Sequence, residues 1–318
     1  MDGHGSLGNI GLLQDKLKRL NVAPEPLDYA LMVFAGDNGV SRENLSYYEP
    51  MSSCSIVVGH LTGRSPTARL MQRLNREEWI VDVGLARDIP IASERLITGF
   101  KAVQGTGNIL EGPALSREQV VKSLQAGEAT VEMLVERGKS ALGLGEIGVG
   151  NTLSAYALTV ELLGLPPSRV VGWGSDNRGD LYEHRLRLVT SIARRQKDSS
   201  RHVLSALEEV GSSEIIAMAG AVLGACRLNV PVMLDGFVSA VAALAAYHLD
   251  EGSARVLIAP TLTRERAHPG VLNELGLTPL LNLNMGYGEG LAAGLGLFLL
   301  EMANDFRTKQ DLCSCKEN

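Results

Sequence analysis

An acidic residue stands between two glycines near the end of the chain, in LNLNMGYGEGLAAGLGLFLLEMA (281–303). Glycines at 286, 288 and 290 allow backbone conformations that side chains forbid, and they let a ligand approach closely. The run that follows is apolar on nearly every face and predicts a buried helix. Burial that begins beside Glu289 would make its carboxylate more basic. The alternative is an acid that only complements the N-terminal dipole of the helix.

A glycine-rich turn leads into a second predicted helix in GLGEIGVGNTLSAYAL (143–158). Backbone N–H groups at Gly148 and Gly150, with the polar groups of Asn151 and Thr152, would form an anion site at the helix N-terminus. The stretch lacks the lysine of a P-loop. Its first glycines fit G-x-G-x-x-G, which leaves a dinucleotide-binding enzyme open. The next strand's acid, however, comes about 28 residues after Gly148, against about 20 in that motif. A purely structural turn is the other alternative.

Three further segments place polar residues at predicted strand ends. GWGSDNRGDLYEHR (172–185) offers Ser175 and Arg185 to a phosphate, although Arg185 alone could be a surface residue of a helix. AGDNGV (35–40) and LDGF (234–237) each carry an Asp before Gly, and such acids often only bind turn amides. The six histidines show no H-E-x-x-H or comparable pairing, so no metal site is expected.

Composition restricts the ligand class. The chain has 318 residues, a net charge of −6 and only 4% aromatic residues, which argues against nucleic-acid and anionic-membrane surfaces. We expect small-molecule ligands. The sequence begins without a signal peptide, and no apolar run reaches the roughly 20 residues that span a bilayer. Four scattered cysteines predict reduced thiols in a cytoplasmic enzyme, and the C-x-C of Cys313 and Cys315 is expected in a frayed tail.

The elements that must position these residues alternate between apolar strands and helices. The apolar runs that end in Gly or Asp do not alternate between apolar and polar residues. Such continuous apolar runs are typical of strands that are buried on both faces of a parallel sheet. Helical patterns separate them, among them 116–138, with Ser116 as its cap, and 214–228. We predict an α/β fold with a doubly wound parallel sheet in residues 29–261, and a small all-helical lobe from 1–28 and 262–318. The predicted strands lie in 29–39, 79–84, 169–176, 230–237 and 254–260.

The same segments, taken in order, resemble one enzyme family along almost the whole chain: the nicotinate-nucleotide:dimethylbenzimidazole phosphoribosyltransferases, which activate the lower ligand of cobamides. The blocks that carry the resemblance are GSLG (5–8), AGDNGV (35–40), VDVG (81–84), GTGNILEGPAL (105–115), GEIGVGNTLSA (145–155), GWGS (172–175), EIIAMAGAVLGA (214–225), PVMLDGF (231–237) and LGLTPLLNLNMGYGEG (275–290).

The resemblance implies a Rossmann-like sheet with a small helical lobe, no cofactor, and nicotinate mononucleotide and a small aromatic acceptor as substrates. It also implies a dimer, or a heterodimer with a paralogous chain. Glu289 aligns with the catalytic base. The implied nucleotide-binding residues are Glu146, Gly148, Gly150, Asn151, Thr152, Gly174, Ser175 and Arg185. The implied acceptor-binding residues are Asp37, Asn38, Ser46, Met285 and Gly288.

Departures from the family pattern gather on the acceptor and dimer sides. The family usually has His at Asn38, Arg at Gly107, Arg-Leu at Gly286 and Tyr287, and a Gln near Cys54. The family's helical N-terminal arm has no counterpart before GSLG. These departures resemble the two-subunit branch that ribosylates phenol or p-cresol, which makes a phenol or a benzimidazole the expected acceptor. A non-catalytic partner subunit is the alternative from another class, and a dehydrogenase is a third.

Overall fold

A parallel six-stranded sheet forms the centre of the computed structural model, which describes residues 7–46, 48–174, 179–195 and 202–314. The strand order is β3-β2-β1-β4-β5-β6, and all neighbouring pairs are parallel. The strands are β1 (Tyr29–Gly36), β2 (Glu77–Gly84), β3 (Leu96–Ile97), β4 (Ala141–Ile147), β5 (Val232–Met233) and β6 (Leu257–Ile258). The predicted α/β class with a parallel sheet is therefore confirmed.

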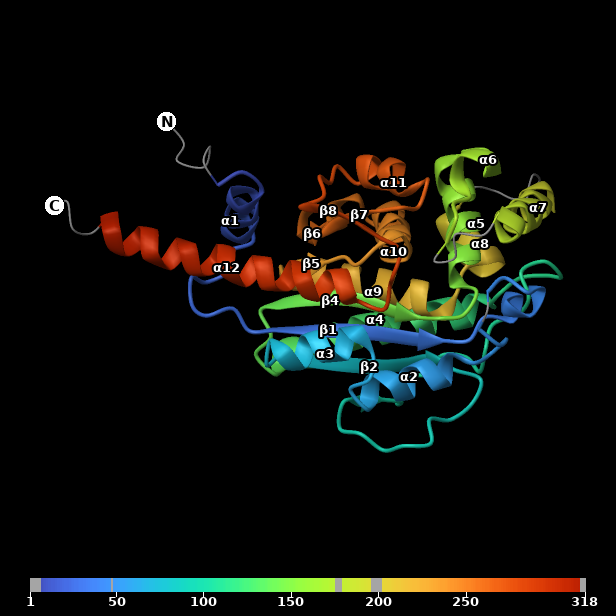
Figure 1. Cartoon of the computed structure of the whole chain (residues 1–318), viewed down its shortest axis with the longest axis horizontal. Coiled ribbons are helices and arrows are strands. Elements are labelled where there is room, and N and C mark those ends of the chain that lie inside the picture. The colour runs from blue at the N-terminus through green and yellow to red at the C-terminus, as the bar shows by residue number, and fades with distance from the viewer. Residues whose placement is uncertain (1–6, 47, 175–178, 196–201, 315–318) are drawn as a thin grey trace.

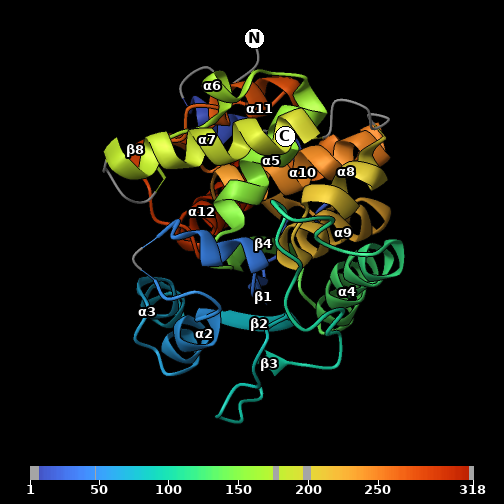
Figure 2. The ribbon, with the colours of Figure 1, turned by 90° about the vertical axis from the view of Figure 1, so that its right-hand side faces the viewer.

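Both faces of the sheet are buried, as the continuous apolar runs predict. All eight residues of β1 are buried, and successive side chains enter different cores. Met32 and Phe34 belong to the larger core, whereas Leu31 and Val33 belong to the smaller one. Figure 2 shows the two layers of helices that cover these faces, with α2 and α3 on one side and α4 and α9 on the other.

The helices follow the strands as crossover connections and as additions at both ends of the chain (Figure 1). Helix α4 begins at the predicted cap, where Ser116 and Gln119 form a reciprocal capping box. The helical segments are α1 (Asn9–Arg19), η1 (Gly39–Glu43), α2 (Ser53–Leu61), α3 (Pro66–Arg73), α4 (Arg117–Glu136), α5 (Asn151–Leu163), α6 (Pro167–Val170), α7 (Gly179–Arg195), α8 (Val203–Val210), α9 (Ser213–Leu228), α10 (Phe237–Leu249), η3 (Glu251–Val256), α11 (His268–Glu274) and α12 (Leu291–Ser314).

Strand β4 corrects the interpretation of 143–150 as a turn. Gly143 and Gly145 lie inside the strand, which pairs with β1 and β5. A Cβ at Gly143 would lie 2.8 Å from Leu297, and one at Gly145 would lie 2.8 Å from the backbone of Gly290. These glycines therefore let α12 and the turn before it pack directly on the sheet, so the G-x-G-x-x-G match has a packing cause.

Two other predicted elements differ from the structure. The predicted strand at 169–176 is wrong, because α6 ends at Val170 and residues 171–174 are irregular. The C-terminal segment is not all helical, because β7 (Thr261–Thr263) and β8 (Leu281–Met285) form a separate parallel pair. The division into a larger domain and a smaller lobe stays a prediction.

In the ranges that the structure describes, no helix combines the length and apolar character needed to cross a bilayer. Cys54 and Cys226 carry free thiols. The side chain of Cys313 and the whole of Cys315 lie outside the described part of the chain.

Candidate active site

A cavity lies where the segments after β4, β5 and β7 meet the turn before α12. It collects most of the residues that the sequence singled out. Those that line it are Ser46, Glu146, Gly148, Gly150, Asn151, Thr152, Gly174, Arg185, Asp235, Gly288 and Glu289. The carboxyl ends of parallel strands are where ligands bind in open α/β sheets, which agrees with this placement.

Three predicted acceptor residues lie outside this lining. Asp37 is fully buried and accepts hydrogen bonds from the backbone N–H groups of Ser53 (3.2 Å) and Ala86 (2.9 Å). Asn38 is also buried and donates to Glu214 Oε1 at 2.7 Å. Met285 ends β8 without reaching the cavity. Ser175 lies outside the described residues.

Glu289 occupies an unusual backbone conformation at the entrance of α12. Its φ is +60°, in the left-handed region that non-glycine residues rarely adopt, and Gly290 follows with φ +83°. Asp235 fixes this turn, because its carboxylate accepts hydrogen bonds from the N–H groups of Gly290 (3.1 Å), Ala292 (2.8 Å) and Ala293 (3.2 Å). The acid at the start of the apolar helix is therefore not its cap; Asp235 takes that role.

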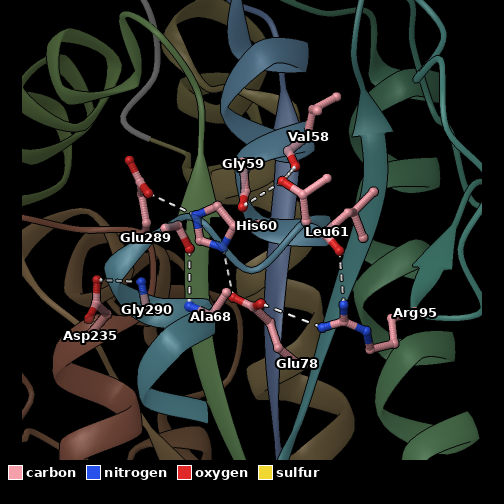
Figure 3. Close-up of polar contacts among 12 residues, drawn as sticks. Val58, Gly59, His60, Leu61, Ala68, Glu78, Arg95, Asp235, Glu289 and Gly290 are labelled. Carbon is pink, nitrogen blue, oxygen red and sulfur yellow. Dashed lines mark hydrogen bonds and ion pairs between the residues drawn. The ribbon is translucent and has the colours of Figure 1, made fainter. Parts of the chain in front are cut away.

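The side chain of Glu289 is held by a buried histidine (Figure 3). Glu289 Oε2 lies 2.8 Å from His60 Nε2, and His60 Nδ1 lies 2.7 Å from Glu78 Oε1. Glu78 in turn faces Arg95 Nη1 at 4.0 Å. His60 is completely buried and Glu78 is 1% exposed, whereas Glu289 is 18% exposed and lines the cavity. The three residues form a line from the interior to the cavity.

Burial disfavours the charged imidazolium of His60, but hydrogen bonds and charge from Glu289 and Glu78 outweigh it and raise the pKa of His60 to about 9. A raised pKa favours an imidazolium at neutral pH, which would give one N–H to each carboxylate. Tyr287 also donates its hydroxyl to Glu289 Oε2, and burial together with that carboxylate raises the pKa of Tyr287. Oε1 has no hydrogen bond to any residue that the structure describes.

The opposite wall of the cavity is the N-terminal end of α5. Gly150, with φ +94°, precedes the first helical residue, Asn151, whose side chain donates to Glu146. Burial raises the pKa of the Glu146 carboxyl, and the nearby carboxylates of Asp235, Glu214 and Glu289 act in the same direction. Backbone N–H groups at such a helix start suit an anion, and the predicted anion site stays a prediction.

Arg185 brings a buried positive charge to the cavity. It lies on α7, is 6% exposed, and donates to the carbonyl oxygens of Trp173 (2.7 Å) and Leu45 (2.8 Å). Gly174 lies against the guanidinium, because a Cβ there would meet Nη1 at 2.7 Å. Arg185 is therefore not a surface arginine, and it lines the same cavity as Glu289.

Sequence reasoning missed His60, Glu78 and the hydroxyl of Tyr287. One local signal existed for His60: it shares the buried face of α2 with Val57 and Leu61. A histidine on such a face needs polar partners. Its partners stand 18 and 229 positions away in sequence, so their identity could not be inferred locally.

The structure also shows what lies beside Gly286, one of the departures from the family pattern. A Cβ at Gly286 would lie 2.1 Å from Arg264 Nη2, so the guanidinium of Arg264 occupies the space that a side chain at 286 would fill. Over the described residues, no three His, Cys, Asp or Glu side chains are grouped so as to hold a metal ion.

Comparisons with known proteins identify the family of this chain. A family model described as a phosphoribosyltransferase, DBI_PRT, matches residues 1–312. The nicotinate-nucleotide–dimethylbenzimidazole phosphoribosyltransferase of Clostridium acetobutylicum is 30% identical over 302 residues, which cover 93% of this chain and 85% of that protein. The protein of the same name from Thermus thermophilus is 33% identical over 299 residues, covering 92% and 88%.

The fold is shared with solved relatives as well. A crystal structure of CobT from Thermus thermophilus superposes with a TM-score of 0.89 at 32% identity, covering 96% of this chain and 91% of that chain. Sequence and structure thus match over nearly the full length of both proteins. The chain belongs to the nicotinate-nucleotide–dimethylbenzimidazole phosphoribosyltransferase family.

Proposed function

We propose that this enzyme transfers the phosphoribosyl group of nicotinate mononucleotide to a small aromatic acceptor, giving an α-riboside phosphate for cobamide synthesis and releasing nicotinate. The observation that carries the proposal is the position of Glu289. Its carboxylate lines the same cavity as Arg185 and the N-terminal end of α5, so a base and an anion site share one space.

The chemistry requires little more than this arrangement. Nicotinate leaves C1′ of the ribose as a neutral pyridine, so the leaving group needs no general acid. The acceptor attacks the opposite face of C1′ and must lose its O–H or N–H proton. Glu289 Oε1 is free to accept that proton, and general base catalysis of this kind contributes typically 10²–10⁴-fold. Holding both substrates in one cavity supplies a further part of the rate.

The nucleotide end of the cavity is assigned to the α5 side. The phosphate would meet backbone N–H groups near Gly148 and Gly150, and the side chains of Asn151 and Thr152. The guanidinium of Arg185 complements its charge, since arginine forms strong charge-assisted hydrogen bonds to phosphate. Glu146, held by Asn151, is then a neighbour of the nucleotide.

For the acceptor we propose a phenol such as p-cresol, with a benzimidazole as the alternative. Leu45, Tyr48, Ile56 and Tyr287 give the cavity apolar and aromatic walls near the base. A phenol presents one oxygen to Glu289 and its apolar ring to such walls. Asn38 and Cys54 do not line the cavity and therefore do not carry this proposal. Gly286 and Tyr287 are the departures from the family pattern that do line it.

The second candidate function is a ligand-binding partner subunit that supports a paralogous catalytic chain. The intact Glu289 and its buried partners favour an active chain over this alternative. The proposed assembly is a dimer, formed either by two copies or with the paralogue.

The decisive assay measures nicotinate release from nicotinate mononucleotide with p-cresol or 5,6-dimethylbenzimidazole, followed by mass analysis of the riboside. It is run on the chain alone and with any paralogue supplied. Glu289→Gln should reduce the rate at least roughly 10²-fold with nucleotide binding retained. Glu301→Gln is the matched control, because Glu301 pairs with Arg76 and does not line the cavity. Benzimidazole riboside without phenolic riboside would refute the phenol assignment, and a fully active Glu289→Gln variant would refute the base.

A further inference from the structure

A buried histidine connects the carboxylate in the cavity to the protein interior. His60 lies on α2, Glu78 on β2, and Glu289 on the turn before α12, so three separate elements meet at one imidazole. Neither His60 nor Glu78 lines the cavity. Any effect of these two residues on a reaction in the cavity must therefore pass through Glu289.

Two carboxyl groups, one at each ring nitrogen, favour a doubly protonated ring. A neutral imidazole has one donor nitrogen and one acceptor nitrogen. Here both nitrogens face carboxylate oxygens, at 2.7 and 2.8 Å. Loss of the ring proton would turn a lone pair toward one of the two carboxylates and break that contact. Two ionised carboxylates keep both contacts together only while His60 carries its charge.

The two donors on Glu289 share one oxygen. His60 Nε2–H and the Tyr287 hydroxyl both reach Oε2, and this leaves Oε1 for the cavity. A carboxylate with one oxygen fixed by two donors cannot rotate freely, so its second oxygen keeps a defined direction. Resting on the function proposed above, we propose that His60, charged and anchored by Glu78, is the positioning residue that aims Oε1 of Glu289 at the acceptor proton.

The balance of the step follows from this arrangement. The acceptor's O–H bond breaks and its proton passes to Glu289 Oε1, while the acceptor oxygen bonds to C1′ and the C1′–N bond breaks with its electron pair on nicotinate. His60 keeps both of its protons and gives or takes none. Its role is to orient Glu289 and not to transfer a proton.

The charged groups around Glu78, His60 and Glu289 determine how the hydrogen bonds among these three residues respond to pH. His60 faces Glu78 and Glu289, and Glu78 faces Arg95 at 4.0 Å. Glu289 also faces Tyr287, and its charge acts on Glu146 and Asp235, which lie beside the same turn. Glu78 is the carboxylate whose replacement alters His60 without touching the cavity, which makes it the most informative position to change.

The first test is Glu78→Gln, with Glu301→Gln as a control for loss of one paired carboxylate. Nicotinate release is measured from pH 6 to 10 with whichever of p-cresol and 5,6-dimethylbenzimidazole the wild type uses faster. We expect the alkaline decline of kcat to move down by about one pH unit or more in Glu78→Gln, because His60 loses one of the charges that retain its proton. The KM for nicotinate mononucleotide should stay within about twofold. An unmoved profile would overturn the proposal.

The second test changes the ring itself. His60→Phe should lower kcat by as much as about 10²-fold, the effect expected when a reacting group is misplaced by about 1 Å. His60→Gln keeps one N–H donor and should recover part of that loss. A His60→Phe variant with kcat within twofold of wild type would refute the positioning role, even if Glu289→Gln is inactive.

A measurement without catalysis separates this inference from the proposed function. Nitrogen NMR of the wild type should show His60 doubly protonated at pH 7.5, and the Glu78→Gln and Glu289→Gln variants should each lose that proton at lower pH. A singly protonated His60 in the wild type at pH 7.5 would overturn the inference, whether or not the chain turns over any acceptor.

Discussion

The buried His60 predicts how the stability of this protein depends on pH. Its pKa is about 9 in the folded protein and 6.5 without the fold. Because the folded value is the higher one, the stabilisation is fully present below pH 6.5 and is lost as pH rises through about 9. The rise is worth about 3 kcal/mol, at about 1.4 kcal/mol for each pKa unit. His60 is completely buried, so solvent screening does not reduce this figure.

The assay compares urea unfolding of the wild type and of His60→Gln at several pH values from 6 to 9.5. The difference in unfolding free energy between the two proteins should shrink by about 3 kcal/mol over that range. His248→Gln serves as control, because His248 is exposed and its loss removes a histidine without removing a buried charge. A difference that stays constant across the range, within about 0.5 kcal/mol, would show that His60 is not charged between its two carboxylates.

Three other substitutions test the cavity. Arg185→Ala should weaken nicotinate mononucleotide binding by about 1.5–3 kcal/mol in calorimetry, which is the range for a hydrogen bond to a charged group. The control is Arg187→Ala, which removes an exposed arginine from the same helix and should leave binding unchanged. Asp235→Asn should lower the unfolding free energy by about 1–3 kcal/mol, because one of the two acceptor oxygens becomes an NH2 group that faces a backbone N–H, at Gly290 or at Ala292 and Ala293. An unchanged urea midpoint would contradict this. Gly148→Ala would place a Cβ 2.0 Å from Glu214 Oε1 and should destabilise by about 1–3 kcal/mol, whereas Gly112→Ala has no neighbour within 4 Å and should be tolerated.

The fold was predictable where burial leaves a direct mark on the sequence. The run from Tyr29 to Gly36 is apolar at nearly every position because both of its faces are covered, and it forms the strand expected. The same logic failed for Ala141–Ile147, where glycines take the place of branched residues. Those glycines are needed because α12 approaches the strand closely, and this is a fact of tertiary packing that no local pattern contains.

The candidate site, like the fold, was predictable only in part from the sequence. A glycine-rich turn at a helix start pointed to Gly148 and Asn151, and an acid between two glycines before an apolar helix pointed to Glu289. Arg185 looked local and ambiguous in sequence, yet α7 carries it into the cavity. His60 and Glu78 could not be paired with Glu289 in advance, since only the packing of α2 against β2 and the α12 turn brings them together.

The left-handed backbone at Glu289 has a consequence for how such chains diverge. The other non-glycine residues in that conformation, within the described ranges, are asparagines and Met51. A non-glycine residue there costs about 1–2 kcal/mol. Replacement by glycine would relieve the strain while removing the carboxylate, so if Glu289 is the base proposed above, selection for the reaction would keep glutamate at this position. In an organism with two copies, a copy that has become a mere partner is free to relax to glycine or asparagine here. On the function proposed above, the residue at this turn would distinguish a catalytic subunit from a partner subunit that lacks the base.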